Sequence, residues 1–292
     1  MERGVSMGER TEADPLIVSE GLPGRAMTER ILKVAGESGY RAALVDATDG
    51  SVTAWPRFAR IVRAAACGLA RRGLAEGDTA GVFVQDAASA AIAVNAIRAA
   101  GAMACLVRSD ADPADVAGQL NACGARLLIT SAPLAELAAE GADRSRVRQV
   151  IAFGEAAGTT PFSSLLESGR HGQRDGHAAV EPGLVDPPSA VDQSGRPEGN
   201  GLADEHDLAD GGGPGAGREL TQRDVVVAGP PCGDGSAYIS LLDLTLVTGA
   251  TLVAAPVTLV TAAMRVYKGT AAIVPRGTHV PGVPPARLFP VA

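Results

Sequence analysis

Aromatic residues and lysine are scarce in this chain of 292 residues, and acidic residues outnumber basic ones. Aromatics make up 3% of the sequence and hydrophobic residues 46%, so the core must be built mainly from Ala, Val, Leu and Ile. Lys33 and Lys268 are the only lysines, which leaves two candidates for any lysine-dependent chemistry. The formal net charge of -7 argues against a nucleic-acid partner, because such a partner requires a basic face.

Closely spaced cysteine pairs and long apolar runs are also missing. Cys67, Cys105, Cys123 and Cys232 form no CxxC or metal-ligand spacing, so we expect buried free thiols and no metal site. No apolar stretch reaches 18 residues, and the charged segment Met1–Pro15 does not look like a signal peptide. The sequence therefore predicts a cytoplasmic protein with no membrane partner.

Apolar strands alternate with helices over residues 27–167. Thr79–Gln85, for example, reads as a strand, and Ala87–Ala100 reads as the helix after it. Because such alternation is typical of buried parallel strands, we predict an α/β fold with a mainly parallel β-sheet flanked by helices on both faces. The other expected elements are helix 27–37, a hairpin of 42–47 and 51–55, a helix from Pro56 to Gly73, strand 102–107, helix 113–122, strand 126–130, helix 133–139 and strand 147–153.

Composition separates the rest of the chain into four segments. Residues 1–26 are expected to be a flexible tail, and residues 168–220 a disordered loop rich in Gly, Pro and acidic residues. Residues 221–275 should continue the α/β domain, and residues 276–292 should form an irregular tail. Within the continuation we expect strands at 224–228, 250–254 and 270–274, and helices at 236–247 and 257–267.

Several phrases, taken in order, resemble the adenylate-forming superfamily, which contains the AMP-binding acyl-CoA and aryl-CoA ligases. Residues 49–55 and the helix ending at 68–74 are similar to its hairpin and first long helix. Residues 125–129, 224–227 and 249–253 are similar to later strands in the same order. The resemblance implies the fold of the first part of the N-terminal domain of these enzymes.

The resemblance also implies an ATP-binding loop, and residues 194–199, which read SGRPEG, lie where it is expected. The superfamily loop is rich in Ser, Thr and Gly and ends in Pro-Lys-Gly, so that its amides and hydroxyls hold phosphates. Here Glu198 replaces the lysine and places negative charge against polyphosphate. The segment is either a degenerate ATP loop, with Ser194, Gly195 and Gly199 as vestigial contacts, or a chance match in a loop of this composition.

Other candidate sites favour structural roles. Residues 230–235 could form a phosphate-binding nest, but they lack the Lys-Ser/Thr of a P-loop, so a strand–helix turn is expected. Lys268 is expected to be a charge at a helix end, and the acidic run 204–210 a solvated loop. His206 lies in the same loop, where no rigid frame would support a triad. We therefore assign no catalytic and no metal-ligating residue.

The superfamily's later motifs for adenine, ribose and magnesium have no counterpart before the sequence ends, and neither does its C-terminal domain. The resemblance then implies a truncated, non-catalytic relative that needs no cofactor alone and binds an acyl group, a protein partner or a second copy of the chain. Strand 270–274 would leave an open sheet edge, which favours such association. The alternative is an acyl-CoA or aryl-acid ligase component that uses ATP and Mg²⁺ together with a second chain.

Overall fold

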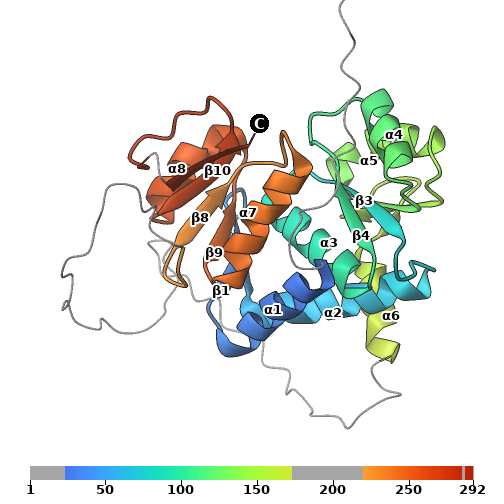
Figure 1. The fold of residues 1–292 in the computed structure, drawn as a ribbon, viewed down its shortest axis with the longest axis horizontal. Coiled ribbons are helices and arrows are strands. Elements are labelled where there is room, and N and C mark those ends of the chain that lie inside the picture. Colours follow the sequence, from blue (N-terminus) through green and yellow to red (C-terminus); the bar gives the residue numbers. More distant parts are fainter. Residues whose placement is uncertain (1–23, 173–219, 285–286, 292) are drawn as a thin grey trace, which may run out of the picture.

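Two β-sheets with helices between them make up the described part of the chain (Figure 1). The computed structural model describes residues 24–172, 220–284 and 287–291. One sheet has six strands in the order β11-β10-β8-β9-β1-β2, and the other has five in the order β4-β3-β5-β6-β7. Neighbouring strands are parallel except in the β1–β2 hairpin. The strands are β1 Ala42–Asp46, β2 Val52–Ala54, β3 Thr79–Phe83, β4 Met103–Leu106, β5 Leu127–Ser131, β6 Gln149–Phe153, β7 Thr160–Pro161, β8 Val225–Ala228, β9 Thr251–Ala254, β10 Ala271–Pro275 and β11 Leu288–Val291.

The helices lie in three layers, one between the sheets and one outside each sheet (Figure 1). Helix α3 contacts both β9 and β3, so it lies between the two sheets. Helices α4 and α5 cover the outer face of the five-stranded sheet, and α8 covers the outer face of the six-stranded sheet. The helices are α1 Gly24–Glu37, α2 Trp55–Arg71, α3 Ala87–Ala99, α4 Pro113–Ala122, α5 Ala135–Asp143, α6 Ser163–Gly172, α7 Gly235–Val247 and α8 Val260–Val266, with 3-10 turns η1 Ala132–Leu134 and η2 Val257–Leu259.

Successive side chains along the buried strands point to opposite faces of each sheet, so the apolar side chains are divided among three cores. In β8, Val226 faces the central core, and Val227 faces the outer core beneath α8. In β3, Val82 faces the central core, and Phe83 faces the outer core beneath α4 and α5. Because both faces of these strands are covered, their sequences read as continuous apolar runs rather than as alternating ones.

Helix α6 packs closely on α2 because a glycine lies at the contact. A Cβ atom added to Gly68 of α2 would lie 2.5 Å from the backbone oxygen of Leu165 in α6. Leu165 is fully buried in the central core. The early part of α6 is therefore an integral part of the domain.

A buried ion pair joins α3 to α7. Nη1 of Arg98 donates to both carboxylate oxygens of Asp243 at 2.8 Å, and both side chains are less than a tenth exposed. Burial raises the pKa of Asp243, and the charge and hydrogen bonds of Arg98 oppose that rise. The pair fixes how the helix that follows β3 is placed against the helix that follows β8.

The predicted α/β fold with mainly parallel strands and flanking helices is confirmed, but the strands form two sheets rather than one. The five-stranded sheet comes from residues 79–161, whereas the six-stranded sheet joins residues 42–54 to strands after residue 220. The strands that join these two parts are far apart in the sequence, because Leu44 of β1 pairs with Leu252 of β9. Local sequence patterns carry no information about such a pairing.

Three segments that we expected to be irregular are regular instead. Residues 24–26 form the first turn of α1, and residues 168–172 form the end of α6. Residues 288–291 form β11, which pairs with β10 and covers the edge that the sequence left open. Pro290 is tolerated there because β11 is an edge strand. The rest of the expected loop, up to residue 219, lies outside the described residues.

Candidate functional site

The carboxyl ends of strands from both sheets meet at one place. The backbone N–H and the hydroxyl of Ser109, after β4, both donate to the carbonyl oxygen of Pro231, after β8, at 3.0 and 2.8 Å. Gly235 begins α7 so close to β4 that an added Cβ would lie 2.8 Å from the Leu106 oxygen. Ligands of open parallel sheets usually bind at such carboxyl ends. We call this region the strand-end junction, comprising residues 84–86, 107–110 and 229–235 with Asp46 and Tyr238.

Asp86 places a carboxyl group at the junction, between the end of β3 and the start of α3. Its Oδ1 accepts the backbone hydrogen of Ser89 at 2.7 Å, so Asp86 is the N-cap of α3. Burial raises the pKa of Asp86, the hydrogen bonds from Ser89 oppose that rise, and the nearby Asp46 adds to it. The carboxyl group is therefore committed to the helix cap.

Tyr238 is the largest polar side chain at the junction and is fully buried. Its hydroxyl donates to the carbonyl oxygen of Gly229 at 2.6 Å. Burial raises the pKa of Tyr238, and the neighbouring Cys232 and Asp86 raise it further. The phenol therefore stays neutral and keeps the β8–α7 loop against the end of its own strand.

The loop between β8 and α7 places a thiol and a carboxylate at the junction. Burial raises the pKa of Cys232, Asp110 adds to the rise, and Arg108 opposes it, so the thiol stays protonated. Asp234 is the N-cap of α7, and its Oδ1 accepts from the amide and the hydroxyl of Ser236 at 2.8 and 2.9 Å. The carboxylate thus occupies the position at which a helix N-terminus would attract an anion.

The described side chains of the junction stabilise loops and show no activated reaction centre. The thiol is held protonated, the phenol is neutral and committed to a carbonyl, and two carboxylates cap helices. An activated nucleophile would need a lowered pKa or an adjacent base, and neither is found among these side chains.

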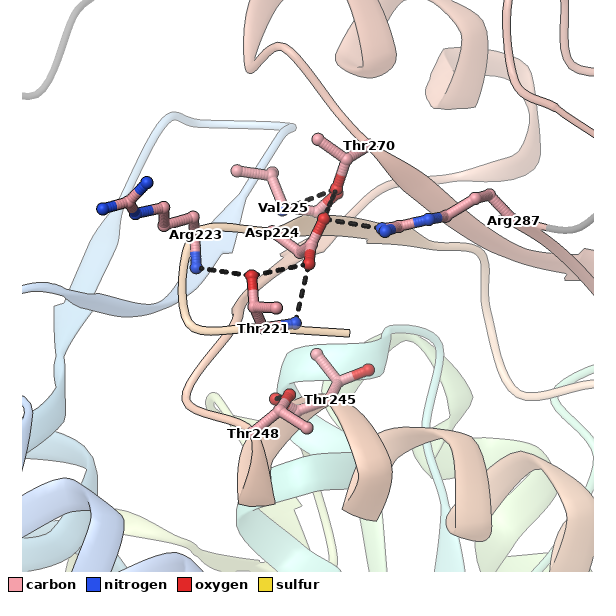
Figure 2. Close-up of polar contacts among 8 residues, drawn as sticks. All are labelled: Thr221, Arg223, Asp224, Val225, Thr245, Thr248, Thr270 and Arg287. Atoms are coloured by element: carbon pink, nitrogen blue, oxygen red, sulfur yellow. Dashed lines mark hydrogen bonds and ion pairs between the residues drawn. The ribbon is translucent and has the colours of Figure 1, made fainter. Parts of the chain in front are cut away.

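A second polar cluster lies at the opposite end of β8 (Figure 2). Asp224 precedes β8 and accepts four hydrogen bonds: from the amide and hydroxyl of Thr221 at 2.7 and 2.9 Å, from the Thr270 hydroxyl at 2.8 Å and from Arg287 Nη1 at 2.6 Å. Burial raises the pKa of Asp224, but these hydrogen bonds outweigh it and leave the pKa below its ordinary value. Arg287 directly precedes β11, so the cluster holds the last strand against β8 and β10.

Sequence analysis assigned residues 194–199 to an ATP loop. Ser194, Gly195 and Gly199, with Glu198, lie outside the described residues. Residues 230–235 form the expected strand–helix turn, with its helix N-terminus filled by a carboxylate. Lys268 is exposed and follows the C-cap of α8 with a φ of 52°, which confirms its position at a helix end.

The cysteines are free, as predicted, but their burial is not as predicted. Cys67 is exposed, and Cys105, Cys123 and Cys232 are half-buried. Cys67 lies on the solvent side of α2, away from the buried stripe that contains Phe58 and Leu69.

Sequence reasoning missed Asp46, Asp86 and Asp224 as organising residues. A usable signal was present, because Asp46 is the last residue of an apolar strand and Asp86 directly precedes a helix. Asp224 gave no such signal, since its partners Thr270 and Arg287 are distant in sequence.

The described residues contain neither a metal-binding cluster nor a membrane-spanning helix. No group of three or more His, Cys, Asp or Glu side chains in residues 24–172, 220–284 and 287–291 could hold a metal ion. Within the same ranges, no helix is both long and apolar enough to cross a membrane.

Comparison with known proteins gives one family and a consistent set of structural neighbours. The family model described as AMP-binding enzyme matches residues 32–191, more than half of the chain. No curated protein matches the chain.

The similar solved structures are ligases and a synthetase. A long-chain-fatty-acid-CoA ligase from Archaeoglobus fulgidus has a TM-score of 0.62 and 17% identity, over 85% of this chain and 51% of that one. A putative long-chain-fatty-acid CoA ligase from Rhodopseudomonas palustris has a TM-score of 0.60 and 17% identity, over 87% and 63%. An amide bond synthetase from Marinactinospora thermotolerans has a TM-score of 0.58 and 15% identity, over 87% and 49%. The chain therefore spans about half to two thirds of the length of these proteins, and the likeness concerns the fold.

Proposed function

Because the chain belongs to the AMP-binding enzyme family, we propose that it is a non-catalytic relative of the carboxylate-activating ligases. In this proposal the chain keeps the α/β fold of the family and binds an acyl or aryl group or a protein partner. It does not activate a carboxylate by itself. The strand-end junction is the candidate binding region, because it lies at the carboxyl ends of parallel strands.

The charge of the strand-end junction is the observation that carries the proposal. Carboxylates from Asp86 and Asp234 fill the N-termini of α3 and α7, the positions that would otherwise attract phosphate. Asp46 lies near Asp86 and adds negative charge. The described residues therefore do not fit a nucleoside triphosphate here, and Glu198 has the same unfavourable sign in the degenerate loop.

The second candidate function is ATP-dependent activation of a carboxylic acid, with Mg²⁺, in an assembly with a second chain. Its support is the family match together with the structural likeness to a ligase and an amide bond synthetase. In that case the partner would supply phosphate-binding charge, because Arg108 at the junction is paired with Asp110.

ATP–pyrophosphate exchange distinguishes the two functions. The purified protein should show no exchange with a panel of aliphatic and aromatic carboxylic acids, and calorimetry should detect no binding of ATP with Mg²⁺. The Glu198→Lys variant restores the expected charge in the loop and should also remain inactive, because the charge of the junction is unchanged. Exchange by the wild-type protein with any acid would overturn the non-catalytic proposal.

Binding of the acyl group needs its own measurement. Decanoate and benzoate represent the acyl and aryl classes. One of them should raise the Tm of the protein, because a ligand that binds only the folded state stabilises it. ATP should leave the Tm unchanged. If neither acid raises the Tm, the acyl-binding part of the proposal fails. A cytoplasmic location fits this proposal, because the four cysteines are free.

A further inference from the structure

Two thiols lie on the same side of the five-stranded sheet, beneath α4. In β4, Ala104 and Leu106 pack into the central core, and Val107, directly after the strand, packs into the outer core. Since side chains alternate along a strand, Cys105 points to the outer side, toward α4. Cys123, the C-cap of α4, packs against that same outer core.

The helix approaches the sheet closely at this point because a glycine lies beneath it. Gly81 of β3 is the register partner of Cys105 in β4. A Cβ added to Gly81 would lie 2.4 Å from Cδ2 of Leu120, so α4 rests almost directly on this part of the sheet. Cys123 follows Leu120 by one turn, and its Sγ lies 3.5 Å from the Leu120 oxygen. The two cysteines are thus neighbours across the gap between β4 and α4.

Both thiols can be reached by a small oxidant. Each is half-buried rather than fully buried, and β4 is an edge strand of its sheet. The other two cysteines are placed differently, because Cys67 lies on the exposed side of α2 and Cys232 in the loop after β8.

We propose that Cys105 and Cys123 are a reversible modification site, at which a peroxide oxidises the two thiols to an intramolecular disulfide.

The two thiols differ in acidity in the way that this reaction requires. Hydrogen bonding to Cys105 lowers the pKa of Cys123, whereas hydrogen bonding to Cys123, followed by burial, raises the pKa of Cys105. Since the thiolate is the nucleophile, Cys123 is the thiol that reacts first.

The chemistry balances with a peroxide as the oxidant. The Cys123 thiolate attacks one oxygen of hydrogen peroxide, the O–O bond breaks, and a sulfenic acid forms while the leaving hydroxide takes up a proton to become water. The Cys105 sulfur then attacks the sulfenic sulfur, the S–O bond breaks, and the thiol proton leaves with the hydroxide as a second water. Two thiols and one peroxide thus give one disulfide and two waters.

The disulfide would act on the strand-end junction through β4. The short segment after this strand contains Ser109, which holds the β8–α7 loop through two hydrogen bonds to Pro231. Fixing β4 to α4 therefore reduces the freedom of the loops at which the two sheets meet.

Peptide mapping after peroxide treatment tests the site in a variant that carries only this pair. The Cys67→Ala, Cys232→Ala double variant should lose two hydrogen atoms in its intact mass when it is treated with hydrogen peroxide. It should remain monomeric on a non-reducing gel, yield one cross-linked Cys105–Cys123 peptide and recover its mass with dithiothreitol. A gain of oxygen without a cross-link, or a cross-link between two chains, would overturn the proposal.

Single variants identify the cysteine that reacts first. Cys105→Ala should stop at a sulfenic acid on Cys123, which dimedone traps, whereas Cys123→Ala should react with peroxide much more slowly. Circular dichroism checks that each single variant is folded. If one of them is not folded, the Cys67→Ala, Cys232→Ala variant, which keeps both Cys105 and Cys123, decides the result. Loss of two hydrogen atoms by Cys105→Ala would contradict the assignment.

Discussion

At the scale of single residues, the structure depends on carboxylates that accept several hydrogen bonds. Asp224 is the strongest case, since it accepts four hydrogen bonds, one of them from the Arg287 cation, at a site that is almost closed to water. Charge-assisted hydrogen bonds of this kind are roughly twice as strong as neutral ones. The ionised form of Asp224 is therefore part of the folded state.

The pKa of Asp224 predicts how stability depends on pH. Because its folded pKa is below the ordinary 3.8, its contribution is fully present above that value and is lost as the pH falls through the lower folded pKa. Asp224→Asn should cost about 2–3 kcal/mol in the free energy of unfolding at pH 7 and much less in strong acid. Urea unfolding at several pH values measures this.

Asp49→Asn is the matched control for that experiment. Hydrogen bonds from Ser51 lower the pKa of Asp49 as well, but Asp49 is exposed in the β1–β2 turn. Its replacement should leave stability almost unchanged at every pH. Equal losses for Asp224→Asn at neutral and acidic pH would show that packing, rather than charge, holds the cluster together.

At the scale of elements, the contact between α2 and α6 depends on a residue without a side chain. Gly68→Ala would place a Cβ 2.5 Å from a backbone atom of α6, so the two helices must separate. We expect a loss of about 2 kcal/mol in stability, measured by urea unfolding, because overpacking outweighs the helix propensity of alanine.

Gly118→Ala gives the opposite result in a comparable position. Gly118 lies in α4, and an added Cβ meets nothing within 4 Å. Stability should rise by about 0.5–1 kcal/mol, since alanine is favoured over glycine inside a helix. A stabilising Gly68→Ala would mean that α6 is not packed as described.

The ion pair between α3 and α7 predicts a strong interaction between two substitutions. Arg98→Met leaves the buried Asp243 carboxylate without its cation and should cost about 3–5 kcal/mol in stability. Adding Asp243→Leu should recover a large part of that loss, because the pair is then replaced by apolar packing. A double-mutant cycle by chemical denaturation measures the coupling, and additive losses would contradict it.

Most elements could be predicted from the sequence because their patterns are local. Strand β3 is a continuous apolar run, and α3 follows an aspartate cap, so both agree closely with the prediction. Strand β7 could not be found, because two residues carry no periodicity. Strand β11 was hidden by Pro290, which reads as irregular when the strand order is unknown.

The candidate site was less predictable than the fold. The strand-end junction is built by contacts such as Ser109 with Pro231, which are 122 residues apart in the sequence. Neither residue type indicates a site, and the partner of each is decided by how the two sheets pack. Resemblance to a family directed attention to residues 194–199, which the structure does not describe.

At the scale of the whole molecule, β11 covers the edge of β10 and becomes the edge strand of the six-stranded sheet. Removing residues 285–292 would expose the edge of β10 and delete Arg287, the cation of the Asp224 cluster. The shortened chain should unfold at a lower Tm and self-associate, because an unpaired strand edge offers free hydrogen-bonding groups. Light scattering measures the association.

Arg287→Ala in the full chain separates the two effects of that removal. It deletes the ion pair but keeps β11, so it should lower the Tm without causing association. If the shortened chain stays monomeric at high concentration, the edge of β10 is protected in another way.

The pairing of β1 with β9 also determines when each sheet can form during synthesis. The five-stranded sheet is complete in the chain once residue 161 has been made, whereas β1 must wait for Leu252, about 200 residues after Leu44. At roughly 5–20 residues per second, the ribosome needs about 10–40 s to supply that partner. During this interval the β1–β2 hairpin leaves the ribosome with an unpaired edge. A chaperone that captures apolar strands should therefore bind nascent chains that end between residues 161 and 250, and should release them once β9 is available.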